Sequence, residues 1–313
     1  MEALGKKYNA VLQQTMLRIK DPKVSVPFYE KHFGMQLVHK YDFPQWKFSL
    51  YFLERPSASF EGCGEPGTPT SENYLWNMTG QSTLELTHNH GSEDDPDFSV
   101  WSGNGGRDLP RDSSLFIENG PVRSFGHIAF NVDDVYSYSA ALEEEGVRFQ
   151  KKPDEGRMKG LAFCLDPDGY WIELVARSRS FPGVSANLSQ TMLRVKDAAA
   201  TVDFYQNVMG MQLMRKMEIP NDFTNYFLTS VLTPDEKERY DKEQIDPNST
   251  EASEFTHSLW YPILEITHNH GTESDDEFQI STGNDGKWQG FGHIGFIVDD
   301  LEEIGRASCR ERV

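Results

Sequence analysis

The sequence has few cysteines and no long apolar segment. Its three cysteines, Cys63, Cys164 and Cys309, include no CxxC pair. This pattern excludes a disulfide framework and a thiolate zinc site, and it is typical of a reducing compartment. No run of about 18 apolar residues occurs, so we expect no membrane-spanning helix. The first residues, MEALGKKYNAVLQQ, lack an apolar segment, and we therefore expect no secretory signal.

Basic residues are also few relative to acidic ones. The 313 residues include 30 Lys and Arg against 49 Asp and Glu, which gives a formal net charge of −19. Nucleic acids and anionic membrane surfaces bind basic patches, so we expect this chain to bind neither. The hydrophobic share of 37% is enough for a packed core, and the length is typical of about two domains. These properties indicate an acidic cytoplasmic protein of two domains.

Four sequence blocks occur twice in the same order. QTMLRIKD returns as QTMLRVKD, FYEKHFGMQL as FYQNVMGMQL, LELTHNHG as LEITHNHG, and FGHIAFNVDD as FGHIGFIVDD. Such self-similarity indicates a tandem duplication. The segment RSRSFPGVSANL between the copies contains Ser, Pro and Gly and is typical of a linker. We therefore expect a first domain over residues 9–177, a linker over residues 178–187 and a second domain over residues 188–302.

Each unit mixes strand and helix patterns. Alternation of apolar residues predicts strands, and apolar spacing followed by glycine predicts helices that end at Gly34 and Gly146. Charged or Gly- and Pro-rich segments, including residues 54–71 and 233–251, read as loops. The first unit then holds two βαβββ-like modules, over about residues 11–105 and 122–176, and the fold class is α+β. The expected strands are 12–19, 48–53, 83–87, 126–132, 160–165 and 171–175, and the expected helices are 24–33 and 133–145.

Four polar residues occupy strand positions that should be apolar: Gln14, Glu85, His127 and Glu173. Taken singly, each is more often a hydrogen-bonded core residue or a solvent-facing one. An ionisable group inside a sheet is costly unless it is paired or bound to a metal, and a metal explains all four residues together. The second unit repeats three of them. One nitrogen and three oxygens suit zinc, nickel, cobalt or manganese, with open positions for water or substrate.

The tripeptide His-Asn-His, at residues 88–90 and 268–270, offers an alternative. It resembles a nuclease tripeptide, although its flanks lack that context and the net charge opposes DNA binding. Its two histidines could also bind a metal.

The repeated blocks, together with KKPDEGRMKGLAFCLDPDGYWIEL in the first unit, resemble glyoxalase I (lactoylglutathione lyase) in its two-domain tandem form, a family of the vicinal-oxygen-chelate superfamily. The resemblance covers about residues 9–302. It implies paired βαβββ modules that form half-barrel sheets. It also implies isomerisation of the methylglyoxal–glutathione hemithioacetal to S-lactoylglutathione by proton transfer through an enediolate. The expected cofactor is one divalent metal per complete site, zinc first and nickel as the alternative, with glutathione as co-substrate.

The resemblance implies that each metal site takes residues from both units, and that Glu173 is the catalytic base with an opposing carboxylate of the Glu85 and Glu265 type. Two sets of metal ligands follow: Gln190, Glu265, His127 and Glu173 in a complete site, and Gln14, Glu85 and His293 in an incomplete one. The residues that match glutathione-binding positions are Arg18, Asn89, Arg194, Asn269, Arg123 and Lys151.

The second unit departs from the family pattern. The counterpart of Glu173 would fall beyond Val313, and Gln289 stands where the first unit has Arg123. We therefore expect a truncated second domain and only one working site. Residues 303–313, EIGRASCRERV, lack the apolar spacing of the preceding helix pattern and read as a non-native tail. The full-length form is expected to be a monomer, whereas the chain as written could form swapped dimers.

Two other functions stay open at this point. A non-catalytic member of the superfamily would keep the fold and sequester a ligand without a metal. An extradiol dioxygenase would need two His and one Glu, which this ligand set does not match.

Overall fold

The computed structural model describes residues 3–55, 62–77, 82–178, 183–243, 245–259 and 261–302. The proposed tail over residues 303–313 and part of the proposed linker lie outside the described residues. The second unit begins with a strand at Ala186, two residues earlier than the expected boundary.

The first unit contains two βαβββ modules, which follow a short helix, α1 (Leu4–Lys7). The first module consists of β1 (Val11–Ile19), α2 (Pro22–Phe33), β2 (Gln36–Phe43), β3 (Phe48–Glu54), α3 (Pro69–Asn77) and β4 (Thr83–Asn89), followed by a 3-10 turn, η2 (Ser92–Asp94). The second consists of β5 (Phe125–Val132), α4 (Val135–Glu144), β6 (Phe149–Lys151), β7 (Leu161–Leu165) and β8 (Trp171–Ala176).

The second unit repeats the first module and begins another. Its elements are β9 (Ala186–Val195), α5 (Ala198–Asp203), the π-helical turn η3 (Phe204–Val208), β10 (Gln212–Ile219), β11 (Phe223–Thr229), α6 (Pro234–Glu243), α7 (Thr250–Ser258), β12 (Ile263–Asn269), the 3-10 turn η4 (Thr272–Ser274), β13 (Asn284–Asp285), β14 (Trp288–Gln289) and β15 (Phe291–Ile297).

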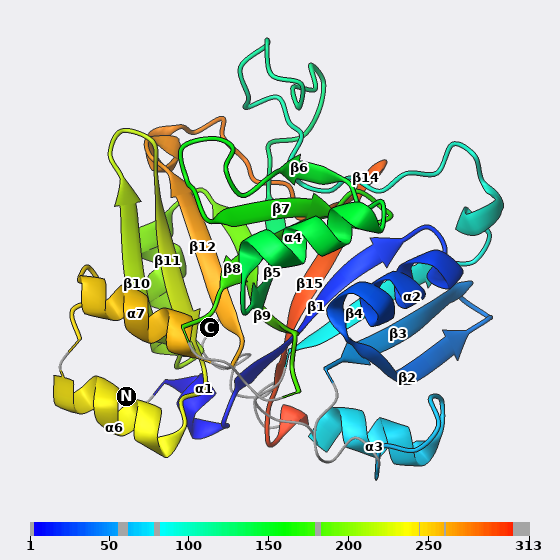
Figure 1. Ribbon diagram of the computed structural model, residues 1–313, viewed down its shortest axis with the longest axis horizontal. Coiled ribbons are helices and arrows are strands. Elements are labelled where there is room, and N and C mark those ends of the chain that lie inside the picture. Colours follow the sequence, from blue (N-terminus) through cyan, green and yellow to red (C-terminus); the bar gives the residue numbers. More distant parts are fainter. Residues whose placement is uncertain are drawn as a thin grey trace.

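The modules pair across the two units. An eight-stranded sheet has the order β10-β11-β12-β9-β5-β8-β7-β6, so the second module of the first unit continues into the first module of the second unit. A five-stranded sheet has the order β15-β1-β4-β3-β2, and β13 and β14 form a separate pair. In Figure 1 the strands of the first module lie at the right, β10–β12 lie at the left, and β5 and β8 lie between them.

Repeated aspartates begin three of the helices. The side chains of Asp21, Asp134 and Asp197 accept hydrogen bonds from backbone N–H groups in the first turns of α2, α4 and α5. This is the usual way in which a carboxylate satisfies unpaired N–H groups at a helix start. Gly34 ends α2 in the left-handed conformation, with φ of 63°, as the sequence predicted.

One segment differs from its predicted loop. Residues 234–243, inside the charged segment over residues 233–251, form helix α6. Two ion pairs four residues apart, Lys237–Asp241 at 2.7 Å and Arg239–Glu243 at 3.1 Å, stabilise this polar helix. The charged segment is helical because basic and acidic residues lie four positions apart, where they pair on one face of a helix.

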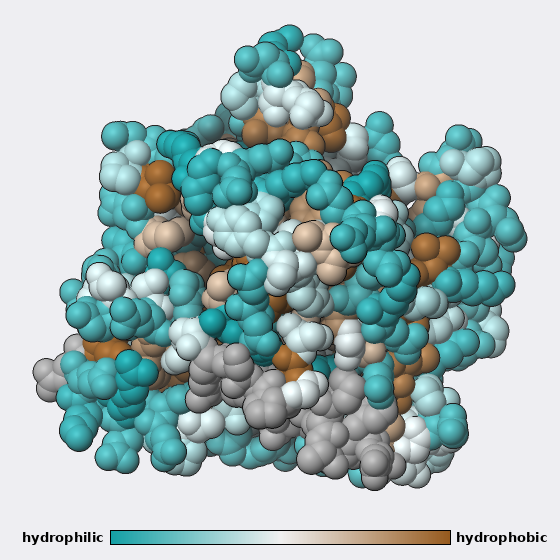
Figure 2. Space-filling model, viewed as in Figure 1, coloured by the Kyte–Doolittle hydropathy of each residue, from teal (hydrophilic) through white to brown (hydrophobic). Residues whose placement is uncertain are grey.

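The largest apolar core joins the two modules of the first unit. Phe33 of α2 and Phe130 of β5 lie with their ring centroids 4.3 Å apart, and both are buried. On the face seen in Figure 2, hydrophilic residues predominate and apolar residues form small separate groups. None of the helices in the described ranges is both long and apolar enough to cross a membrane.

The backbone conformation of the loop before β5 requires glycine at position 103. Its φ of 84° is in the left-handed region, and a Cβ atom there would lie 2.3 Å from the carbonyl oxygen of Phe125. Gly91 has a similar φ of 97°, but its Cβ atom would meet nothing within 4 Å.

We predict that Gly103→Ala destabilises the fold more than Gly91→Ala. Gly91→Ala should cost about 1–2 kcal/mol, the cost of a left-handed conformation for a residue with a Cβ atom. Gly103→Ala adds a clash with backbone that cannot move without disturbing β5. The free energies of unfolding in urea measure both changes, and equal losses would contradict the prediction.

Candidate metal centre and substrate cavity

Four adjacent strands place one polar side chain each at the centre of the eight-stranded sheet. These residues are His127 on β5, Glu173 on β8, Gln190 on β9 and Glu265 on β12. Ala129 of β5 pairs with both Glu173 and Gln190, so the strand register brings the two modules together at this level. Two residues come from each unit, which is the arrangement that the family resemblance implied. Gln14 and Glu85 lie in the other sheet.

The side-chain atoms of this four-residue centre lie within contact distance of one another. The Gln190 amide nitrogen donates to Glu173 Oε2 at 2.9 Å and to Glu265 Oε2 at 2.8 Å. His127 Nε2 lies 3.1 Å from Glu173 Oε2 and 3.4 Å from Glu265 Oε2. The contact with Glu173 lacks the geometry of a hydrogen bond, and His127 Nε2 is buried without a hydrogen-bond partner. The nitrogen therefore points between the two carboxylates.

Two buried carboxylates beside one imidazole favour a positive charge between them. Burial opposes the charged form of His127, but Glu173 and Glu265 outweigh it and raise the pKa of His127 to about 9. Burial also raises the pKa of Glu265, against the opposite effect of His127. In a protein without metal, a proton on His127 supplies the charge that a cation would otherwise bring.

Glu265 is held more firmly than Glu173. Asn225 Nδ2 on β11 donates to Glu265 Oε1 at 2.6 Å, and Thr267 Oγ1 donates to Asn225 Oδ1 at 2.9 Å. In the described part of the chain, Oε1 of Glu173 has no such hydrogen bond. Glu265 is thus fixed at both oxygens, and Glu173 at one.

A second cluster lies in the five-stranded sheet. Gln14 Nε2 donates to Glu85 Oε2 at 2.8 Å, and His293 Nε2 lies 3.2 Å from the same oxygen. The side chain of His293 is 48% exposed, against 6% for His127. Within the described residues, the only group of three or more His, Cys, Asp or Glu side chains close enough to hold a metal is His127, Glu173 and Glu265. The second cluster thus has one carboxylate where the first has two.

A cavity of about 620 Å³ opens over the four-residue centre. Its wall includes three of the predicted glutathione-binding residues, Arg123, Arg194 and Asn269. Arg194 donates to the carbonyl oxygen of Phe125 at 3.1 Å and to Asn104 Oδ1 at 3.0 Å. Burial, reinforced by Arg123, lowers the pKa of Arg194 to about 9. A cavity of this size suits a ligand as large as a tripeptide.

The other predicted substrate residues lie elsewhere. Lys151 donates from Nζ to the carbonyl oxygen of Leu161 at 2.6 Å and is not among the residues of the cavity wall, whereas Lys159 is. Arg18 and Asn89 belong to the first module, away from this cavity. Arg18 donates to Asn284 Oδ1 at 2.8 Å, as Arg194 does to Asn104.

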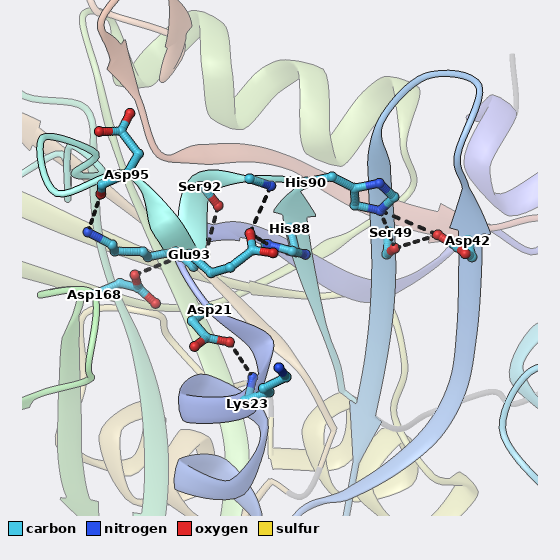
Figure 3. A network of polar contacts seen from close by, with 12 residues as sticks. Asp21, Lys23, Asp42, Ser49, His88, His90, Ser92, Glu93, Asp95 and Asp168 are labelled. Atoms are coloured by element: carbon cyan, nitrogen blue, oxygen red, sulfur yellow. Dashed lines mark hydrogen bonds and ion pairs between the residues drawn. The ribbon is translucent and has the colours of Figure 1, made fainter.

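The His-Asn-His segments stabilise loops. His88 Nε2 contacts Glu93 Oε2 at 2.7 Å, and His90 Nε2 contacts Ser49 Oγ at 2.8 Å, so the two rings serve different partners (Figure 3). The second unit repeats this arrangement, with His268 on Glu273 and His270 on Thr224. Nε2 of each histidine is therefore engaged, which disfavours the alternative of a metal site here.

Sequence reasoning missed the residues that support the centre. Asn225 had a signal, because it occupies the place in FTNYFLT where the first unit has Leu50 in FSLYFLE. Asn104 also had one, because Gly103-Asn104 returns in the second unit as Gly283-Asn284. Asp108, which pairs with Arg123, had none.

Comparisons with known proteins find the same family in both units. The family model of the Glyoxalase/Bleomycin resistance protein/Dioxygenase superfamily matches residues 11–174 and 187–310. The chain is 38% identical to "Glyoxalase I" of Saccharomyces cerevisiae, over 96% of this chain and 80% of the relative. It is 37% identical to "Lactoylglutathione lyase" of Schizosaccharomyces pombe, over 93% and 82%. The crystal structure of glyoxalase I from Zea mays has a similar fold, with a TM-score of 0.61 and 24% identity, over 97% of this chain and 79% of that one.

We predict that metal binding displaces a proton from His127. With a pKa of about 9, His127 is protonated at neutral pH in protein stripped of metal by a chelator. The cation must displace that proton, so its apparent affinity should rise by about tenfold per pH unit between neutral pH and about pH 9. Calorimetric titration in buffers of different ionisation enthalpy counts the released protons. An affinity that stays flat over this range would refute the prediction.

We also predict that Asn225→Leu weakens metal binding by about 10–100-fold, as loss of a group that orients a metal ligand typically does. Competition with a coloured chelator measures the affinity. Leu50→Asn makes the reverse change at the equivalent place in the first unit and should leave this affinity unchanged. If Asn225→Leu retained the metal as tightly as the unaltered chain, the hydrogen bond would have no role in holding Glu265.

Proposed function

The chain belongs to the glyoxalase/bleomycin resistance protein/dioxygenase superfamily and acts as a lactoylglutathione lyase, and we propose that it does so at the four-residue centre of His127, Glu173, Gln190 and Glu265. The substrate is the hemithioacetal that methylglyoxal forms with glutathione, and the product is S-lactoylglutathione. The observation that carries the proposal is the convergence of these four side chains from both units on one cavity.

The donor set of the centre fits a divalent metal. Nε2 of His127 is buried without a hydrogen-bond partner, and it faces two carboxylates that need a counter-charge. A half-turn of the Gln190 amide would present its oxygen to the same point. One nitrogen and three oxygens suit zinc, with nickel as the alternative. The bound cation would supply Lewis acidity, which stabilises negative charge on the substrate oxygens.

The two carboxylates would have different roles. We assign the base to Glu173, because one of its oxygens has no hydrogen bond within the described residues, whereas Asn225 and Gln190 fix Glu265. Glu173 takes the proton from the carbon beside the carbonyl group and leaves an enediolate. It then returns this proton to the neighbouring carbon, and the hydroxyl proton of the hemithioacetal passes to the former carbonyl oxygen, which leaves the thioester carbonyl group of S-lactoylglutathione.

Cationic and amide groups in the cavity wall would hold glutathione. Arg194 and Asn269 lie on the strands that carry Gln190 and Glu265, four residues further along each. Arg123 precedes β5 and pairs with Asp108 at 2.8 Å. Lys159 offers a further cation from the loop after β6. For Lys151, a role in binding requires that its bond to the Leu161 carbonyl group be exchanged for one to substrate.

The cluster of Gln14, Glu85 and His293 would bind a cation weakly and would not turn over. Among the described residues it offers no second carboxylate, and its histidine is half exposed. A non-catalytic, sequestering role for the whole chain is disfavoured, because such a protein has no need for two buried carboxylates around one imidazole.

We also propose that the protein is cytoplasmic and monomeric. The described cysteines, Cys63 and Cys164, are free and buried, which suits the reducing cytoplasm. A monomer suffices for activity, since both halves of the four-residue centre come from one chain.

We predict that three carboxylate-to-amide changes separate the two clusters. Glu173→Gln and Glu265→Gln should lower kcat by about 10²–10⁴-fold, the range for loss of a positioned proton-transfer group. Glu85→Gln, the matched change in the other sheet, should leave turnover largely intact. The absorbance of the thioester product, followed with methylglyoxal and glutathione, measures each rate.

Near-normal turnover by the Glu173→Gln variant would show that Glu173 is not the catalytic base. Loss of activity in Glu85→Gln with retention in Glu265→Gln would move the working site to the five-stranded sheet.

A further inference from the structure

The two tandem sheets differ in the residues beside their metal-ligand glutamates. In the first unit, β2 places His39 opposite Phe52, and Phe52 pairs with Glu85. In the second unit, β10 places Arg215 opposite Phe227, which pairs with Glu265 in the same way. Strand register therefore makes Arg215 the structural counterpart of His39.

The surroundings of His39 are aromatic. Tyr41 and Phe52 lie edge to face with ring centroids 5.9 Å apart, and Phe52 and Trp76 do so at 5.8 Å. His39 Nδ1 contacts Ser71 Oγ at 2.6 Å, and the Trp76 indole N–H donates to Tyr41. The Tyr41 hydroxyl donates in turn to Glu72 at 2.6 Å, and His39 Nε2 is buried without a hydrogen-bond partner.

The surroundings of Arg215 leave polar atoms available. Its guanidinium carbon lies 5.3 Å from the centre of the Phe227 ring, and Nη2 lies 3.6 Å from Met217 Sδ. No carboxylate of the described residues lies within ion-pair distance of it. His257, from α7, lines the same cavity, and its ring makes no hydrogen bond within the described ranges. Burial and the nearby Arg215 lower the pKa of His257, which keeps the ring neutral at neutral pH.

Arg215 and His257 lie away from the groups assigned to glutathione. Along β12, Asn269 is four residues beyond Glu265, and along β9, Arg194 is four residues beyond Gln190. Arg215 stands level with Glu265 itself, two strands away on β10. A tripeptide that runs from the four-residue centre toward Arg194 and Asn269 therefore leaves the part of the cavity near Arg215 and His257 to the rest of the substrate.

We propose that Arg215 and His257 form a subsite for an anionic substituent on the 2-oxoaldehyde half of the substrate. The inference rests on the proposed function, because it takes glutathione to occupy the other part of the cavity. The substrate class is then the glutathione hemithioacetals of 2-oxoaldehydes that carry a carboxylate or phosphate group, in addition to that of methylglyoxal. An unpaired guanidinium inside an otherwise acidic protein is the group that such a substituent would meet.

Two S-substituted glutathiones test the subsite by binding alone. S-propylglutathione and S-carboxyethylglutathione carry the same three-carbon chain on sulfur, but only the second ends in a carboxylate. Calorimetry with the metal-loaded protein gives both affinities. Arg215→Met should weaken S-carboxyethylglutathione by about 10–100-fold, the loss expected for a charge-assisted hydrogen bond, and should leave S-propylglutathione unchanged or slightly tighter. Arg215→Lys should restore part of the preference.

Lys216→Met is the matched control. It removes a cation from the next position of β10, where Lys216 lies over the Tyr226 ring, and Lys216 is not part of the cavity wall. Neither affinity should change in this variant, and its melting temperature and that of Arg215→Met show whether both fold.

Three results would overturn the inference, and they are distinguishable. Equal weakening of both ligands by Arg215→Met would mean that Arg215 holds glutathione itself. No change in either affinity would mean that the guanidinium has no ligand in this cavity. If the unaltered protein bound neither compound, the proposed glutathione site would fail, and the subsite with it.

Discussion

The pairing of β5 with β9 is the interaction on which the rest of the structure depends. It is antiparallel, it joins the two units within one sheet, and it sets Ala129 opposite Gln190. On one side of this pair, β8 runs parallel to β5 and contributes Glu173. On the other, β12 runs parallel to β9 and contributes Glu265. Because side chains alternate along a strand, a shift of this register by one residue would turn half of the metal ligands to the other face.

The same arrangement explains why the two clusters differ. Every residue of β5 is buried, since β8 and β9 flank it on both sides. Its counterpart β15 pairs only with β1 among the described strands, and most of its residues are partly exposed. A histidine between two buried carboxylates is desolvated and strongly coupled to them, whereas His293 faces one carboxylate and water. The polarity needed for metal chemistry is therefore concentrated in the eight-stranded sheet.

The repeated blocks predicted the α+β fold and the polar strand positions, and the family resemblance implied which four side chains, two from each unit, belong together. Duplication allowed this prediction, because Gln190, Glu265 and His293 showed that the polar positions of the first unit were not accidental. Other features depend on contacts between segments that lie far apart in the sequence. Asn225 reaches Glu265 from a neighbouring strand, and Asn104 reaches Arg194 from a loop. Lys151 matched a family position in sequence, yet its ammonium group is bound to the backbone at Leu161.

The central claim is that one centre, built across both units, holds the catalytic metal. Anomalous diffraction from crystals of the metal-loaded protein, collected at the absorption edge of the bound metal, tests it most directly. We predict one strong peak at full occupancy, ligated by His127, Glu173, Gln190 and Glu265, and weak or no density at Gln14, Glu85 and His293. A dominant peak at the second cluster, or at the histidines of residues 88–90, would contradict the account.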